Sequence, residues 1–406
     1  MPNLDELVGS TKTQSDLSSE QVKIRYNEST SVTGNAGTKF LLKFPKIPGK
    51  FLNLASLKLH FTVAVSGDGY FDAASYQSIF QRVRVLSSSN VLLDVTEWGT
   101  LYTTLKHSKT NVNVENKQSR LNEGVFANTA EASSAGSGTK RVSLCFPYGT
   151  LLNCDSLLPL DKINGQFQIE WYLQDPKKIL ASPTNDVTVN YTMSDIMLIC
   201  DYISSPTLSS YFASSGVNFH VSNWSHRFQP VNDAKAVLRI PSSFTSLSKL
   251  LLLIRDQSKV DSTNTLSTAD RQQSFISYTD LQEIQLYSNN MPLWSEPILN
   301  ANIETELFNE TLKTFPELQH STFHNDVSAS QVQVGSCPIG VNLQSAPSKF
   351  HDALISGLKS KSHVSDLYGV ISWANGVTFT NYAATVFIEN DSRIFVDQNG
   401  ALQIEF

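Results

Sequence analysis

The stretch FQRVRVLSSSNVLLD, Phe80–Asp94, consists of two short apolar runs on either side of a polar turn. LQEIQLYSNNMPLWS, Leu281–Ser295, aligns with it without a gap in the second half of the chain. Only three of the fifteen aligned positions are identical, but both copies alternate apolar and polar side chains before a turn rich in Ser and Asn. Alternation with a period of two is typical of strands with one buried face. Each copy therefore predicts a β-hairpin.

The segments around the two hairpins repeat in the same order. Two strand-like runs precede the first hairpin, Lys39–Phe44 and Ala55–Val65, and two precede the second, Val237–Pro241 and Lys249–Ile254. Each copy is followed by a segment in which apolar residues recur at i, i+3, i+4 and i+7 or four apart. This spacing predicts an amphipathic helix. These expected helices are Thr96–His107 and Ile298–Leu307. The shared order favours an internal duplication over a chance likeness of two hairpins.

The rest of the chain also predicts strands. Alternating or apolar runs occupy 141–146, 167–173, 187–193, 197–202, 377–379, 385–388 and 394–406. Asn399-Gly400 lies between two alternating runs, which is a strong hairpin signal. A helix does not follow each strand, so a parallel α/β fold does not fit. The pattern indicates an all-β sandwich or jelly roll, present twice.

The domain boundaries follow from composition. Residues 1–37 are polar without sustained periodicity and are expected to be an N-terminal arm. We expect the first jelly roll at 38–205, a linker rich in small polar residues at 206–216, and the second jelly roll at 217–406. Two long polar segments, Ser108–Thr139 and Asp256–Ser274, are expected to be loops.

Charge and composition argue against several classes of protein. The 406 residues carry a formal net charge of −6, with 40% hydrophobic and 17% charged residues, which predicts a globular chain with no surface for nucleic acid. The N-terminal segment has no apolar signal core, and we expect synthesis without a secretory signal. The four cysteines form no C-x-x-C pair, and Cys145 and Cys200 are expected to be buried thiols.

Three short motifs contain residue types that can form sites of chemistry. HSTFH, His320–His324, would place two histidines on one helix face, but it lacks the Glu of H-E-x-x-H and an obvious third ligand. AGSGTK, Ala135–Lys140, lacks the order of a phosphate-binding loop. Glu304 and Glu306 do not face each other on a helix and could share a face only on a strand. We therefore predict that the protein is not an enzyme, with no catalytic, cofactor-binding or metal-ligating residues and no cofactor.

The sequence resembles the double jelly-roll major capsid proteins of icosahedral DNA viruses, of the polinton-like virus, virophage and lipid-containing phage type. Three stretches carry the resemblance: Ile79–Asp94, Leu157–Asp175 with its Leu-Pro turn before an alternating strand, and Cys337–Leu358 with its Ser-Gly turn. The likeness is one of layout over about Lys39 to Phe406. It implies two consecutive eight-stranded jelly-roll sandwiches with short helices and long loops.

The resemblance also implies a function. A major capsid protein of this kind self-assembles as trimeric, pseudo-hexameric capsomers in an icosahedral shell. Its partners would be itself as a homotrimer, neighbouring capsomers, a penton or minor capsid protein, and an internal membrane in some viruses, without direct nucleic-acid binding. It would be located in the virion capsid after synthesis in the host cytoplasm or nucleus. The alternative is a tandem β-sandwich binding module, such as a viral spike or a carbohydrate-binding adhesin.

Overall fold

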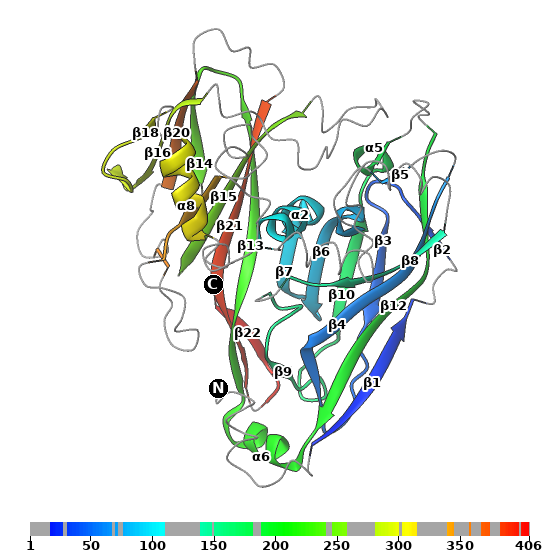
Figure 1. The fold of residues 1–406 in the computed structure, drawn as a ribbon. Coiled ribbons are helices and arrows are strands. Elements are labelled where there is room, and N and C mark those ends of the chain that lie inside the picture. Colours follow the sequence, from blue (N-terminus) through cyan, green and yellow to red (C-terminus); the bar gives the residue numbers. More distant parts are fainter. Residues whose placement is uncertain are drawn as a thin grey trace.

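The computed structural model describes residues 17–26, 31–66, 70–71, 76–109, 139–147, 150–181, 188–240, 246–257, 281–299, 303–314, 339–344, 357–358, 367–373, 382–397 and 399–405. Both long polar segments expected to be loops lie almost entirely outside these residues. Within them the chain forms two β-sandwiches that lie side by side (Figure 1).

The first sandwich consists of two antiparallel sheets. Sheet 1a has the strand order β1 (Ser18–Arg25), β12 (Tyr191–Ser204), β4 (Lys50–Val65) and β8 (Thr139–Cys145), with β2 (Ser31–Thr33) beside β12 and β9 (Leu157–Leu158) beside β4. Sheet 1b has the order β3 (Lys39–Lys43), β10 (Phe167–Leu173), β6 (Phe80–Ser87) and β7 (Asn90–Thr96). Smaller elements are β5 (Tyr70–Phe71), which pairs with β11 (Leu180–Ala181), η2 (Tyr76–Ile79), α2 (Trp98–Lys109) and α5 (Pro176–Ile179).

The second sandwich repeats this arrangement. Sheet 2a has the order β13 (Val217–Val231), β21 (Tyr382–Val396), β15 (Leu247–Asp256) and β19 (Ile339–Asn342), with β22 (Leu402–Glu405) beside β21. Sheet 2b has the order β14 (Lys235–Ile240), β20 (Leu367–Trp373), β16 (Leu281–Ser288) and β17 (Met291–Pro292), with β18 (Ile298–Leu299) beside β16. The π-helical turn η6 (Ile303–Leu307) leads into α8 (Phe308–Thr314), and α6 (Pro206–Ser215) joins the two sandwiches.

Both sandwiches have the jelly-roll order of strands. When the eight main strands of each are numbered along the chain, one sheet has the order first, eighth, third, sixth and the other has second, seventh, fourth, fifth. The two hairpins of the sequence repeat are β6–β7 and β16–β17, the fourth and fifth strands of their sandwiches. The predicted all-β double jelly roll is therefore confirmed.

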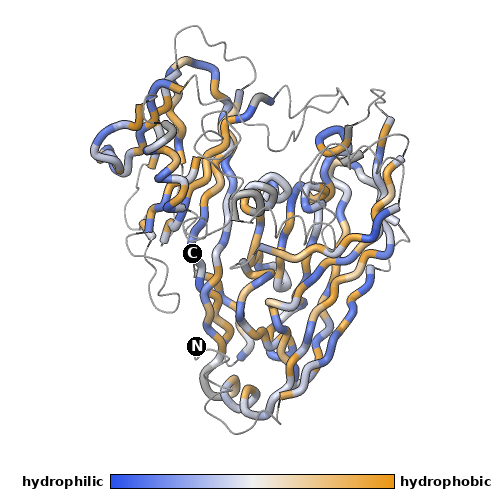
Figure 2. Tube along the Cα trace, in the orientation of Figure 1, coloured by the Kyte–Doolittle hydropathy of each residue, from blue (hydrophilic) through white to orange (hydrophobic). Residues whose placement is uncertain are grey.

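The core follows from the alternation of side chains. In β6 the side chains of Val83 and Val85 are fully buried, and in β4 those of Leu59 and Phe61 are buried between the sheets. Figure 2 shows the same alternation as bands of hydrophobic colour along the strands of both sandwiches. Burial of this apolar surface is the main stabilising contribution to the fold.

The structure differs from the sequence-based expectation in three places. The expected N-terminal arm contributes two strands, β2 and the edge strand β1, and in β1 only Val22 and Ile24 pack toward the core. The linker contains helix α6, with Ser205 as its N-cap and Gly216 at its end. The helix expected at Ile298–Leu307 begins only at Ile303, because Ile298–Leu299 pair with β16, and it continues to Thr314. The helix expected at Thr96–His107 is α2.

Candidate functional site: sheet faces and the junction between sandwiches

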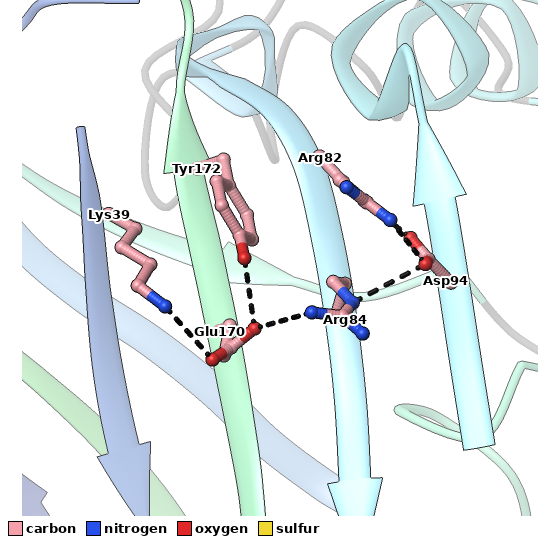
Figure 3. Close-up of polar contacts among 6 residues, drawn as sticks. All are labelled: Lys39, Arg82, Arg84, Asp94, Glu170 and Tyr172. Carbon is pink, nitrogen blue, oxygen red and sulfur yellow. Dashed lines mark hydrogen bonds and ion pairs between the residues drawn. The ribbon is translucent and has the colours of Figure 1, made fainter. Parts of the chain in front are cut away.

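The outer face of sheet 1b carries a lattice of ion pairs (Figure 3). Arg82 and Arg84 point outward from β6 because Val83 and Val85 point into the core. Arg82 donates two hydrogen bonds to the carboxylate of Asp94, at 2.6 and 2.5 Å, and Nε of Arg84 lies 3.3 Å from the same carboxylate. The hairpin register places Arg84 directly opposite Asp94. The hydrogen bond to Asp94 raises the pKa of Arg82.

Glu170 extends this lattice across the sheet to β3. Its carboxylate accepts hydrogen bonds from Arg84 at 3.1 Å, from Lys39 at 3.3 Å and from the hydroxyl of Tyr172 at 3.1 Å. The Glu170 side chain is 11% exposed, whereas that of Lys39 is 54% exposed. Cations and carboxylates alternate across the strands, so most of the charge on this face is neutralised within the chain.

The corresponding face of sheet 2b is aromatic and amide-rich. Tyr287 of β16 and Tyr368 of β20 are opposite each other and stack at 5.0 Å between ring centroids. Gln285, at the position of Arg84 in the repeat, is buried and donates to the carbonyl of Trp294 at 2.9 Å. The two equivalent faces therefore have different chemistry despite their shared topology.

The junction between the sandwiches contains a buried arginine. Arg255, at the end of β15, is 3% exposed. Its guanidinium donates to the hydroxyls of Thr100 and Thr385, at 3.4 and 3.3 Å, and lies 3.9 Å from the carboxylate of Glu97. Glu97 has a φ of 55°, an uncommon conformation for a residue other than glycine. This contact links α2 of the first sandwich to sheet 2a of the second.

His226 lies beside this arginine. Its Nδ1 is 3.1 Å from the hydroxyl of Thr96 in β7, and its ring packs 5.3 Å from that of Phe387. Burial lowers the pKa of His226, and the positive charge of Arg255 adds to this effect, while Glu97 acts in the opposite direction. The neutral imidazole is therefore favoured at this contact.

A second contact lies at the other end of the junction. The turn between β21 and β22 accepts two hydrogen bonds from Asn164 of the first sandwich. The Asn164 amide N–H donates to the carbonyl of Gly400 at 2.8 Å, and its side chain donates to the carbonyl of Asn399 at 2.9 Å. Phe212 of α6 packs against Phe51 at 4.9 Å. Together with the contacts of Arg255 and His226, these contacts hold the two sandwiches to each other.

Most of the motifs considered as chemical sites fall outside the part of the chain that the structure describes. His320–His324 and Cys337 lie outside the described residues, as does most of Ala135–Lys140. Glu306 is exposed on η6. Cys200 is buried, which raises its thiol pKa to about 12, and Cys145 is only half-buried. Within the described part of the chain, no three His, Cys, Asp or Glu side chains are grouped as a metal site would require.

The same part of the chain contains no helix that is long and apolar enough to cross a membrane. Sequence reasoning did not single out Glu97, Arg255 or Glu170. The sequence feature that could have indicated Arg255 is a charged residue at the end of an apolar run, LLLLIRD at 250–256.

Comparison with known proteins gives structural neighbours only. No family model matches the chain, and no curated protein matches its sequence. The structure is similar to that of VP54 of PBCV-1, fitted into a reconstruction of the virophage Sputnik, with a TM-score of 0.65, 8% identity, and coverage of 96% of this chain and 97% of that chain. It is similar to the Faustovirus major capsid protein, with a TM-score of 0.61, 8% identity, and coverage of 93% and 90%.

A third neighbour is a structure of the Sputnik virophage, with a TM-score of 0.58, 12% identity, and coverage of 95% of this chain and 88% of that chain. The resemblance inferred from the sequence is confirmed for the fold. The chain has the double jelly-roll fold over almost its whole length.

Proposed function

We propose that this chain is a major capsid protein that self-assembles as trimeric, pseudo-hexameric capsomers of an icosahedral virus shell. One observation carries the proposal: two jelly rolls of identical strand order lie side by side in one chain. Three structural neighbours, each aligned with at least 93% of this chain, support it. They are the Faustovirus major capsid protein, VP54 of PBCV-1 fitted into a reconstruction of the virophage Sputnik, and a chain from a structure of that virophage.

The duplication supports the pseudo-hexameric form. Two sandwiches with the same topology present similar outer shapes, and three copies present six such units around a three-fold axis. Closed cyclic assemblies of identical chains are the usual form of soluble oligomers. As part of this proposal, the capsomer-building domains are 38–205, completed by strand β1 from the N-terminal segment, and 217–406, joined by the linker at 206–216.

The further partners belong to the same proposal. They are neighbouring capsomers, a penton or minor capsid protein, and an internal membrane in viruses that have one. No direct contact with nucleic acid is part of the proposal, consistent with a net charge of −6. The location is the virion capsid, after synthesis in the host cytoplasm or nucleus. We propose a structural role without catalysis.

Light scattering on the purified full chain tests the proposal. We expect a particle of three times 44.9 kDa, and hexagonal arrays or shells under the electron microscope at high protein concentration. A monomer that binds oligosaccharides on a glycan array would contradict the capsid function. That result would instead support a binding module such as a spike or adhesin.

A further inference from the structure

The contact between the two sandwiches within one chain joins non-equivalent surfaces of equivalent domains. The first sandwich contributes its fifth main strand, β7, and the helix after it, α2, through Thr96 and Glu97. The second sandwich contributes its first main strand, β13, and the outer face of sheet 2a, through His226 and Arg255. A contact of this heterologous kind can be repeated from one unit to the next.

In each sandwich, the equivalent of the surface that the other sandwich contributes to the junction is not used within the chain. The fifth main strand of the second sandwich is β17, and β18, η6 and α8 follow it along the chain. The first main strand of the first sandwich is β1, which forms the free edge of sheet 1a. Within the described residues, neither surface packs against the other sandwich of the same chain. Figure 1 shows them at opposite sides of the molecule, with β18 and α8 on the left and β1 on the right.

The outer face of sheet 1a is basic. The register brings Lys23, Lys58 and Cys145 into one row and Arg25, His60 and Ser143 into the next. Lys23, Arg25 and Lys58 are exposed, as is Arg141 in the following row. Burial lowers the pKa of His60, and Arg141, Lys58 and Lys23 lower it further. Asp195 and Asp201 are the acidic residues of β12 and only partly offset these four cations.

The surface formed by β17, β18, η6 and α8 is apolar and acidic. Among the described residues, Met291 of β17 is the most exposed large apolar side chain, at 70%, and Leu299 of β18 is 49% exposed. Glu296, between these two strands, and Glu306 of η6 are exposed. Glu310 of α8 is paired with Lys313 of the same helix. Exposed apolar side chains with polar residues around them are typical of protein interfaces.

Building on the proposed capsomer function, we propose that the basic face of sheet 1a with β1 in one copy packs on the β17–β18–α8 surface of a second copy. This contact repeats between chains the arrangement that β13 and sheet 2a form with β7 and α2 within a chain. Met291 and Leu299 form its apolar centre, and Glu296 and Glu306 meet Lys23, Lys58 and Arg141. Three such contacts alternate with the three internal junctions and close a ring of six sandwiches.

Charge reversal on each surface tests the contact in the full chain. We expect Lys58→Glu with Arg141→Glu, or Glu296→Lys with Glu306→Lys, to raise the concentration at which trimers dissociate at least tenfold in light scattering. Joining all four substitutions in one chain should restore the trimer in large part. The matched control is Lys235→Glu with Arg239→Glu on the exposed edge of sheet 2b, which should leave the trimer unchanged. Thermal unfolding of each variant verifies that it is folded.

Cross-linking of the unaltered protein gives a second readout that does not depend on the folding of a variant. Copies grown on heavy and light nitrogen are mixed, reassembled and treated with a zero-length carbodiimide reagent, and mixed-isotope peptides are sought by mass spectrometry. We expect such peptides to join Lys23 or Lys58 to Glu296 or Glu306.

The possible results separate the contact from the function. A trimer that survives both reversals, or mixed-isotope links confined to other surfaces, would overturn this interface while the capsid proposal stands. An unaltered chain that never forms a trimer would overturn both.

Discussion

At the scale of single residues, Glu170 is the most connected charge on the outer face of sheet 1b. Its carboxylate accepts hydrogen bonds from Arg84, Lys39 and Tyr172 and is largely shielded from solvent. We expect Glu170→Gln to lower the free energy of unfolding by about 2 kcal/mol, because hydrogen bonds to a charged group contribute more than neutral ones. Urea denaturation followed by circular dichroism measures this change.

Lys39→Met is the control for this substitution. The Lys39 side chain is 54% exposed, and exposed ion pairs typically contribute less than ~1 kcal/mol. Equal losses for the two variants would show that burial of the carboxylate does not determine the strength of the lattice.

A glycine in sheet 2b offers a second prediction. Gly369 faces a small apolar cavity between sheets 2a and 2b, and a Cβ there would meet the flexible end of Leu286 at 3.0 Å. Leu286 also lines the cavity, so a small shift of its side chain into this space would accommodate the Cβ. We expect Gly369→Ala to raise the free energy of unfolding by about 0.5–1 kcal/mol, because the unfolded chain loses conformational freedom. Urea denaturation is again the measurement.

Gly340→Ala in the same sandwich should have the opposite effect. Its Cβ would lie 2.8 Å from the hydroxyl of Thr314 and 2.9 Å from the Thr314 Cβ, on the helix packed against β19. We expect a loss of roughly 1–3 kcal/mol from this overpacking. A loss of similar size in Gly369→Ala would indicate that Leu286 cannot move into the cavity.

At the scale of elements, the sequence predicted what depends on local pattern. Val83, Val85, Ile284 and Leu286 alternate strictly, and the hairpins β6–β7 and β16–β17 form where expected. The edge strand β1 was not predicted, because only Val22 and Ile24 pack inward and the pairing with β12 comes from a segment far along the chain. The caps of α6, Ser205 and Gly216, are residue types typical of helix ends, but the small polar residues between them also favour a linker without a helix.

The ion-pair lattice of sheet 1b also contains contacts that follow from local pattern and contacts that do not. In the sequence repeat, Arg82 and Arg84 of the first copy align with Glu283 and Gln285 of the second, so the polar faces differ in charge. The structure supplies neighbours within the chain: Asp94 comes from the adjacent strand of the hairpin and follows from its register. Glu170 is 86 positions away from Arg84 and could not be paired with it without the sheet order.

The contact between strand β13 and strand β7 should respond to pH. Burial holds the pKa of His226 below its usual value, so the unfolded chain takes up this proton more readily than the folded protein. The contribution of His226 to the free energy of unfolding is fully present above the unfolded pKa of about 6.5. It is lost as the pH falls from there through the folded pKa. We expect His226→Gln to reduce the fall in Tm between about pH 7.5 and pH 5.5.

His220→Gln is the matched control because His220 is exposed on the same strand. Its Tm should fall with pH as steeply as that of the unaltered protein. A His226→Gln protein with an undiminished pH slope would show that acid sensitivity arises elsewhere, for example at His60.

At the scale of the whole molecule, the sequence predicted two sandwiches but not how they meet. The duplication is visible in one chain because each copy repeats the same local pattern. Glu97 and Arg255, by contrast, are joined only after both sandwiches have formed, and no pattern in either segment indicates the other. The same holds for Asn164 and the turn at Gly400. Contacts between domains depend on shape and therefore lie beyond sequence periodicity.

The turn at Gly400 tests whether the two sandwiches unfold as one unit. Gly400 has a φ of 80°, and a Cβ there would lie 1.8 Å from the carbonyl oxygen of Lys162 in the first sandwich. Gly37 also has a φ of 80°, but a Cβ there would meet nothing within 4 Å. The only cost of Gly37→Ala is therefore backbone strain of ~1–2 kcal/mol. We expect calorimetry of Gly37→Ala to show a single, slightly lowered transition. Gly400→Ala should lose the hydrogen bonds from Asn164 as well, and its transition should broaden or split as the second sandwich unfolds separately. Equal effects of the two substitutions would show that this turn adds nothing to the cohesion of the pair, and that Arg255 and its partners hold the sandwiches together without it.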